Sequence, residues 1–249
     1  MAYSMSFNGV DLSTYGLVVV SAEINRASQE PVYVRLPDKA YPFTTQRGPR
    51  VITIDFRVVA ATRAILDSYL DSIKQTITTD TPGDLIRDTL NGRYWEAILD
   101  DFDGGYYAPG MFRGMMTFLC PDARAHAVTQ TSSDFNIDAD PDTVVETTGG
   151  TAYIEPVYTL TAGENLVAVT IKVENTDTSE ELQWTGSLAN GEELEIDVPN
   201  WIVNKEGIAD MATVTGEFPR LKPGQNNSIK VTAFSTTGTL NITYRDRYL

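Results

Sequence analysis

One histidine and one cysteine, His126 and Cys120, are the only side chains of their kinds in this chain of 249 residues. A structural zinc site needs about four such ligands, and neither residue has a partner at ligand spacing. A Ser-His-Asp triad would have to use His126, which lies next to a predicted linker, and the sequence contains no Gly-x-Ser-x-Gly motif. Phosphate-binding and dinucleotide-binding glycine motifs are also absent. These residue types predict no catalytic, cofactor-binding or metal-binding residues.

The acidic segment Asp138-x-Asp140-x-Asp142 has the spacing that begins an EF-hand calcium loop. Such a loop also needs glycine at its sixth position and glutamate at its twelfth. This chain has Thr143 and Gly149 there. We therefore expect a solvated acidic linker, with an irregular surface calcium site as the alternative.

Paired carboxylates could act as the acid and the nucleophile of a glycosidase. The chain has 34 acidic residues, so accidental pairs are certain and a glycan hydrolase stays only as an alternative. In the segment Asp101-Phe102-Asp103-Gly104-Gly105 we expect a glycine-bearing turn between two strands.

Four aromatic side chains are candidates for binding. Trp184 and Trp201 could stack on sugar rings, but large aromatic residues of β-sandwiches are more often buried, and we expect both in the core. Trp184 follows Leu182 at a spacing of two, which favours the same orientation. Tyr106 and Tyr107 could form an interface patch, because tyrosine is enriched in interfaces.

The elements that would position these residues begin with a strand over 51–59, VITIDFRVV, in which apolar and polar residues alternate. The next segment, 62–77, changes to helical spacing, and we expect Thr62 to be its N-cap. The apolar face of this helix comprises Ile65, Leu66, Tyr69, Leu70, Ile73 and Ile77.

Asn-Gly pairs predict two hairpins, because both residues of such a turn must accept positive φ. Asn91-Gly92 would join strands over 85–90 and 94–99, and Asn190-Gly191 would join strands over 182–188 and 194–198. A further strand over 112–119 ends at Cys120-Pro121-Asp122. The first half therefore predicts a β-sheet folded against one helix.

Beyond Val128 every patterned segment has the period of a strand. About eight short strands predict a β-sandwich, and Pro156 suggests that the first of them lies at an edge. The alternating apolar positions are Val167, Val169, Ile171 and Val173; Ile229, Val231 and Ala233; and Leu240, Ile242 and Tyr244.

The formal net charge is −15, and it is unevenly distributed. Residues 1–130 carry a net charge of −3 and residues 131–249 a net charge of −12. This balance argues against binding to nucleic acid or to an anionic membrane, both of which need clustered basic residues. No apolar run approaches the roughly 20 residues of a membrane span, the N-terminus is unlike a signal peptide, and one cysteine allows no internal disulfide. We expect synthesis in the cytosol.

Two motifs resemble the distal tail proteins of long-tailed phages. One is Phe7-Asn8-Gly9-Val10-Asp11-Leu12-Ser13, followed by 15–19, YGLVV, which is similar to the opening of that family. The other runs through Gly216-Glu217-Phe218-Pro219-Arg220-Leu221 to Pro223-Gly224-Gln225-Asn226-Asn227 and resembles the turn of its C-terminal domain. Cys120-Pro121-Asp122 also matches the place where the first domain of that family ends.

The resemblance implies a mainly β protein, with an N-terminal β-sheet or sandwich domain bearing one α-helix and a C-terminal galectin-like β-sandwich. The expected domains are a ring-forming belt domain over 1–130, a linker over 131–148 and the sandwich over 149–249.

The resemblance also implies a structural, non-enzymatic role in the virion, as a homo-hexameric ring at the tail tip. Its partners would be the tail tube protein and the hub or tail-associated protein, with the tape measure and receptor-binding proteins as further partners. Six copies would carry a formal charge of −90, so we expect the less charged first domain to form the ring. The alternative function is a carbohydrate-binding module that contacts a saccharide of the host cell wall or surface.

Overall fold

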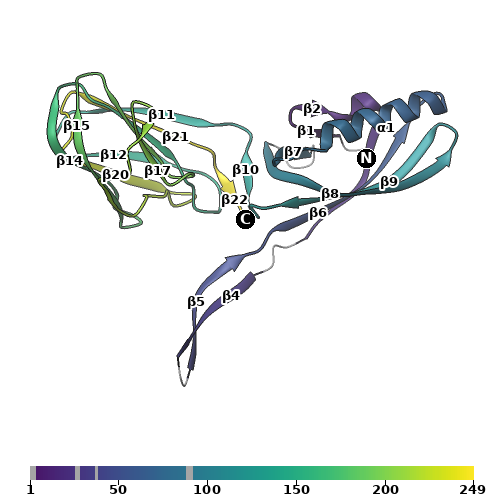
Figure 1. Cartoon of the computed structure of the whole chain (residues 1–249), viewed down its shortest axis with the longest axis horizontal. Coiled ribbons are helices and arrows are strands. Elements are labelled where there is room, and N and C mark those ends of the chain that lie inside the picture. Colours follow the sequence, from purple (N-terminus) through teal and green to yellow (C-terminus); the bar gives the residue numbers. More distant parts are fainter. Residues whose placement is uncertain (1–3, 26–28, 37–38, 88–91) are drawn as a thin grey trace. The chain divides into compact units, whose positions relative to one another are not determined.

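The computed structural model describes residues 4–25, 29–36, 39–87 and 92–249. The chain divides into two compact units, Met1–His126 (unit 1) and Ala127–Leu249 (unit 2), and each is described by itself. Both consist mainly of antiparallel strands, and the helix α1 belongs to unit 1 (Figure 1).

Unit 1 contains an antiparallel sheet in which the strand order is β2-β1-β7-β8-β9-β6-β3. Two further strands, β4 (Gln29–Leu36) and β5 (Lys39–Arg47), pair with each other. The strands of the larger sheet are β1 (Met5–Phe7), β2 (Val10–Asp11), β3 (Leu17–Ile24), β6 (Arg50–Val59), β7 (Gly83–Arg87), β8 (Arg93–Ala108) and β9 (Met111–Cys120).

The alternation predicted for 51–59 is confirmed in β6. Ile52, Ile54, Phe56 and Val58 are fully buried, whereas the residues between them are exposed or half-buried. The buried face packs against α1 and a cluster of aromatic rings, in which Phe56 stacks on Phe112 with ring centroids 6.0 Å apart. One face of this sheet is therefore the core of unit 1.

The helix α1 (Arg63–Ile77) forms where the spacing predicts it, and the Thr62 side chain accepts a hydrogen bond from the amide of Ile65 as its N-cap. The helix lies across the core face of the sheet (Figure 1). Ile65, predicted for the apolar face, is instead 40% exposed because it lies in the first turn, at the margin of that face. The helix residues that are buried are Leu66, Leu70, Ile73 and Ile77.

β7 and β8 form an antiparallel hairpin, as the sequence predicts. Gly92 has φ of +74°, while Asn91 lies outside the described residues. The turn expected at Asp101–Gly105 is wrong, because the segment continues β8. A Cβ atom at Gly104 would lie 2.7 Å from the Cα of Gly114 on β9, so this glycine allows two strands and an aromatic ring to pack closely.

Unit 2 is a sandwich of two antiparallel sheets, and their strands form two layers in Figure 1. Their facing side chains form one core, with Trp184 and Tyr158 among its largest members. The first sheet runs β11 (Thr131–Ile137), β21 (Gly238–Tyr244), β13 (Val157–Thr161), β16 (Glu193–Asp197), β17 (Ile202–Lys205), β18 (Ile208–Ala209). The second runs β12 (Asp142–Thr147), β20 (Asn226–Thr232), β14 (Leu166–Asn175), β15 (Glu180–Leu188), β19 (Val214–Gly216). The short strands β10 (Ala125–Ala127) and β22 (Arg247–Tyr248) complete the chain.

Two expectations for unit 2 are corrected. Asn190-Gly191 forms a turn, but it connects β15 of one sheet to β16 of the other and does not close a hairpin. Turn residues specify only the local reversal of the chain, whereas burial of Leu188 and Leu194 places the two strands in opposite layers. Pro156 precedes β13, a central strand, and at that position it removes no ladder hydrogen bond.

The segment 131–148, for which the sequence predicts a linker, contains β11 and β12. β11 pairs with β21 and β12 pairs with β20, so each strand joins a different sheet. Both lie at sheet edges, where one face is solvated and polar residues alternate with buried ones such as Ile137 and Val144. This mixed composition resembles that of a linker.

The N-terminal motif specifies how unit 1 begins. The Asn8 side chain accepts a hydrogen bond from the Asp84 amide at 2.8 Å, and Asp11 caps a 3-10 turn at Leu12–Tyr15. Gly16 ends this turn at φ +67°, and a Cβ atom there would lie 2.4 Å from the carbonyl oxygen of Val59. Asn8, Asp11 and Gly16 of the motif therefore stabilise the turn with which unit 1 begins.

The C-terminal motif is organised by buried Asn227. Its side-chain oxygen accepts a hydrogen bond from the Lys222 amide at 2.7 Å, and its side-chain nitrogen donates to the carbonyl oxygens of Lys222 and Gln225. Asn175, also fully buried, donates to Asn227 and to the carbonyl of Arg220. The Pro-Gly turn is therefore held to the sandwich by two amide side chains.

We predict that Asn227→Ala lowers the stability of unit 2 by about 1–3 kcal/mol, because it leaves buried backbone groups without partners. For a chain of this size each kcal/mol corresponds to a fall in Tm of about 2–4 °C, measurable by scanning calorimetry. Asn226→Ala is the matched control, since Asn226 is exposed and its loss should change stability by less than about 0.5 kcal/mol. Equal losses in the two variants would contradict the role of Asn227.

Candidate assembly surfaces

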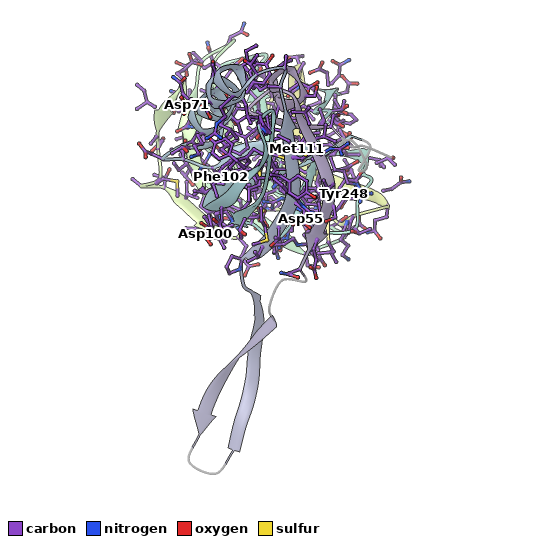
Figure 2. All side chains as sticks on the ribbon, turned by 90° about the vertical axis from the view of Figure 1, so that its right-hand side faces the viewer. Asp55, Asp71, Asp100, Phe102, Met111 and Tyr248 are labelled. Atoms are coloured by element: carbon purple, nitrogen blue, oxygen red, sulfur yellow. The ribbon has the colours of Figure 1, made fainter. Side chains whose placement is uncertain are left out.

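The sheet of unit 1 has one face packed against α1. We call the opposite face the outer face. It carries the side chains that alternate with the buried ones on β3, β6, β8 and β9. These include Val18, Ser21, Glu23, Thr53, Asp55, Arg57, Asp101, Asp103, Arg113, Met115 and Thr117, all exposed or half-buried. Figure 2 labels Asp55 of β6 and Met111 of β9.

A hollow of about 260 Å³ lies on this face. Two of its lining residues, Arg57 and Arg113, are directly opposite each other on β6 and β9. Tyr107, which occupies a bulge of β8 and is 77% exposed, lies beside them. Val20 and Met111 complete the lining. Tyrosine, arginine and methionine are the residue types enriched in protein interfaces.

A second hollow, of about 380 Å³, lies between α1 and the end of β8. Beside it the Tyr106 hydroxyl donates to Asp67 Oδ1 at 2.6 Å, and the Arg63 guanidinium lies over the Tyr106 ring. The bond from Tyr106, together with Arg63, lowers the pKa of the Asp67 carboxyl, and Asp67 in turn raises the pKa of Tyr106. These contacts fasten the start of the helix to the sheet.

Tyr106 and Tyr107 therefore do not form one patch. Tyr106 lies on the helix side, in edge contact with Phe112, while Tyr107 lines the hollow of the outer face. Adjacent residues of a strand point to opposite faces, and this alternation separates them.

The two tryptophans of unit 2 have different environments. Trp184 is 1% exposed, as expected, and its indole nitrogen donates to Asp210 Oδ2 at 3.1 Å. Trp201 is 65% exposed, so the prediction of a core position is wrong. It occupies the β16–β17 connection at φ +57°, and its ring lies 5.6 Å from that of Phe218. With this backbone conformation the indole of Trp201 points to solvent.

The remaining candidates for chemistry have structural surroundings. Burial raises the pKa of the Cys120 thiol to about 12, so the thiolate nucleophile is absent at neutral pH. His126 lies at the end of unit 1, buried and stacked on Tyr94 with ring centroids 5.3 Å apart. Its Nε2 atom lies 3.4 Å from Asp122 Oδ2.

The carboxylates of the 138–142 segment bind backbone amides. Asp142 accepts from the amides of Asp138 and Thr143, and Asp140 accepts from the amide of Ala233. Across the described ranges, no cluster of three or more histidine, cysteine or acidic side chains is arranged to hold a metal ion. Within those same ranges no helix is both long enough and apolar enough to cross a membrane.

The pair Arg57–Arg113 was missed by sequence reasoning. The alternation in 51–59 places Arg57 on the polar face of its strand. That Arg113, 56 residues later, lies beside it is known only from the register of β6 and β9.

Comparison with known proteins matches both units to phage tail families. Residues 11–121 match the phage tail protein RIFT-related domain, and residues 149–248 match the siphovirus-type tail component, C-terminal domain. No curated protein sequence matches the chain.

Among solved structures, the Dit protein of phage SPP1, described as a paradigm of the hub adsorption apparatus in phages that infect Gram-positive bacteria, is similar over the whole of both chains. The identity is 16% and the TM-score is 0.76. A chain of the phage P2 baseplate, in its activated conformation with Ca, is similar over 97% of each chain, with 11% identity and a TM-score of 0.51. These likenesses show the fold. With a tail family matched in each unit and the Dit fold along its whole length, the chain belongs to the phage distal tail (Dit) protein family and is a structural component of a phage tail.

Proposed function

We propose that six copies of this chain form a closed ring at the tip of a phage tail, between the tail tube and the hub or tail-associated protein. The observation that carries the proposal is the agreement of both tail families and the Dit fold over the full chain. The protein would act in the virion by holding neighbours in place, without turnover of a substrate.

The distribution of charge supports a ring built from unit 1. Unit 1 has a net charge of −3 and unit 2 a net charge of −12. Salt screens charges only beyond about 8–10 Å, so closely packed copies of unit 2 would repel one another. A ring of unit 1 with unit 2 at larger radius keeps the acidic surfaces apart. An acidic lumen would also let DNA pass without binding.

We predict that the full chain, alone or co-expressed with the tail tube and hub proteins of its phage, forms six-fold rings. Native mass spectrometry and electron microscopy would measure the copy number and symmetry. A gold-binding tag fused after Leu249, in unit 2, should lie outside the ring wall. A strict monomer in all combinations, or tags lining the lumen, would overturn the arrangement.

Saccharide binding by unit 2 is a second candidate function, favoured by the exposure of Trp201. An indole that is 65% exposed on a sandwich surface presents a flat apolar face of the kind on which sugar rings stack. The neighbouring ring of Phe218 is half-buried against the core and supports the indole from one side. This function would add host contact to the structural role.

If unit 2 binds a cell-wall saccharide of the host, Trp201→Ala should weaken binding at least about tenfold, which corresponds to 1.4 kcal/mol. Loss of the stacking face is the physical cause, and titration of the full chain with purified wall fragments gives the affinity. Ile208→Ala serves as the control, because Ile208 is 73% exposed on β18 but is not aromatic. Binding that survives in the Trp201 variant, or falls equally in both, would exclude this site.

A further inference from the structure

The turn between β16 and β17 holds Trp201 in a backbone conformation that tryptophan rarely adopts. Its φ of +57° lies in the left-handed region, where glycine and asparagine are the common residues and a bulky side chain is an outlier. The amide of Trp201 donates to the carbonyl oxygen of Val198 at 3.3 Å, which closes the turn. Asparagine would fit the same turn at lower cost, yet the chain has a tryptophan there that is 65% exposed. This combination indicates a role in binding.

A carboxylate and an amide belong to the same turn as the indole. Asp197, at the end of β16, accepts hydrogen bonds from the backbone amide of Asn200 at 3.1 Å and from the side-chain nitrogen of Asn200 at 2.7 Å. A carboxylate can accept about four hydrogen bonds, so Asp197 keeps the capacity to bind a further donor. The segment 197–201 therefore combines a flat apolar face with a fixed anion.

The segment that contains this turn is strongly acidic. Between residues 192 and 218 the chain has seven acidic residues and one basic residue, Lys205. The charge of Lys205 is already paired, because its Nζ atom lies 2.9 Å from Glu192 Oε2. Salt screens charges only beyond about 8–10 Å. A ligand with phosphate or carboxylate groups is therefore disfavoured beside Trp201, and a cationic ligand is favoured.

The exposed indole agrees with the sign of this charge. Among aromatic side chains, tryptophan attracts a cation over its ring most strongly. The ring of Phe218 lies 5.6 Å from that of Trp201 and supports it on one side, while most of the indole surface stays in contact with water. A neutral sugar would gain from stacking and hydrogen bonds alone. A sugar with an ammonium group would gain from the attraction of the indole and the carboxylate as well.

We propose that Trp201 and Asp197 form a site for a saccharide that carries free amines, such as a glucosamine oligomer. The sugar ring stacks on the indole, and its ammonium group donates to the Asp197 carboxylate. The inference rests on the proposed saccharide binding by unit 2 and names the class of sugar. It excludes the anionic polymers of a cell wall as ligands of this site. A basic protein segment has the same charge but no sugar ring, and the test separates the two.

Two probes that differ only in their amines test the proposal. One is a chitosan oligomer, in which the amines are free, and the other is the chitin oligomer of equal length, in which they are acetylated. Calorimetric titration of the full chain in a mildly acidic buffer gives both affinities. We expect the free-amine oligomer to bind at least about threefold more tightly. Salt at about 0.5 M should reduce this preference, because it screens the charges.

Variants show whether the preference arises at this turn. Asp197→Asn keeps the shape of the side chain and removes its charge, so the preference should fall below about 1.5-fold while the acetylated oligomer binds as before. Glu164→Gln makes the same change in net charge at an exposed position beyond the other end of β13 and should keep the preference. Trp201→Ala should weaken the binding of both oligomers. Circular dichroism and thermal unfolding would check that the variants fold.

The results separate this inference from the function on which it rests. Equal affinities for the two oligomers, or a preference that survives Asp197→Asn, would overturn the free-amine site and leave saccharide binding standing. The same holds if fragments of the host wall bind but neither oligomer does. Hexalysine that binds as tightly as the chitosan oligomer and competes with it would identify a site for a basic protein segment and overturn the proposal. If no saccharide binds, the proposed saccharide function fails together with this site.

Discussion

The one-sided burial of the unit 1 sheet is the constraint on which the rest of this structure depends. Alternating apolar residues on β6 and β9 bury one face beneath α1, and the same alternation necessarily sends Arg57 and Arg113 to the other. Because the period of a strand is two, a shift of the register by one residue would move the buried side chains to the exposed face and the exposed ones to the core. The surface available for assembly is therefore a direct consequence of how the core is built.

The motifs that resemble the tail family have a physical explanation in folding. Asn8, Asp11 and Gly16 shape the start of unit 1, while Asn227 and Gly224 hold a turn of unit 2. Each satisfies backbone groups or adopts a positive φ that most residues avoid. These residues therefore contribute to the fold of each unit by specifying its turns.

The cysteine and several of the carboxylates that could do chemistry have structural roles instead. Cys120 is buried as a neutral thiol, Asp140 and Asp142 bind backbone amides, and Asp67 is held by Tyr106 and Arg63. The exposed groups that remain include the pair Arg57–Arg113 and the rings of Tyr107 and Trp201, and these residue types are enriched in protein interfaces. The exposed residues are thus of types suited to contacts with other proteins. This agrees with membership of a family of phage tail components.

The sequence by itself determined the local elements. The helix over 62–77 with its Thr62 cap, the alternating strand over 51–59 and the positive φ of Gly92 and Gly191 all follow from residue type and period. Only the tertiary structure decided which strands share a sheet. Asn190-Gly191 turns between layers, Gly104 lies inside a strand, Trp201 faces water, and Arg57 meets Arg113. These features depend on pairing between segments far apart in the chain, and local propensity carries no information about that register.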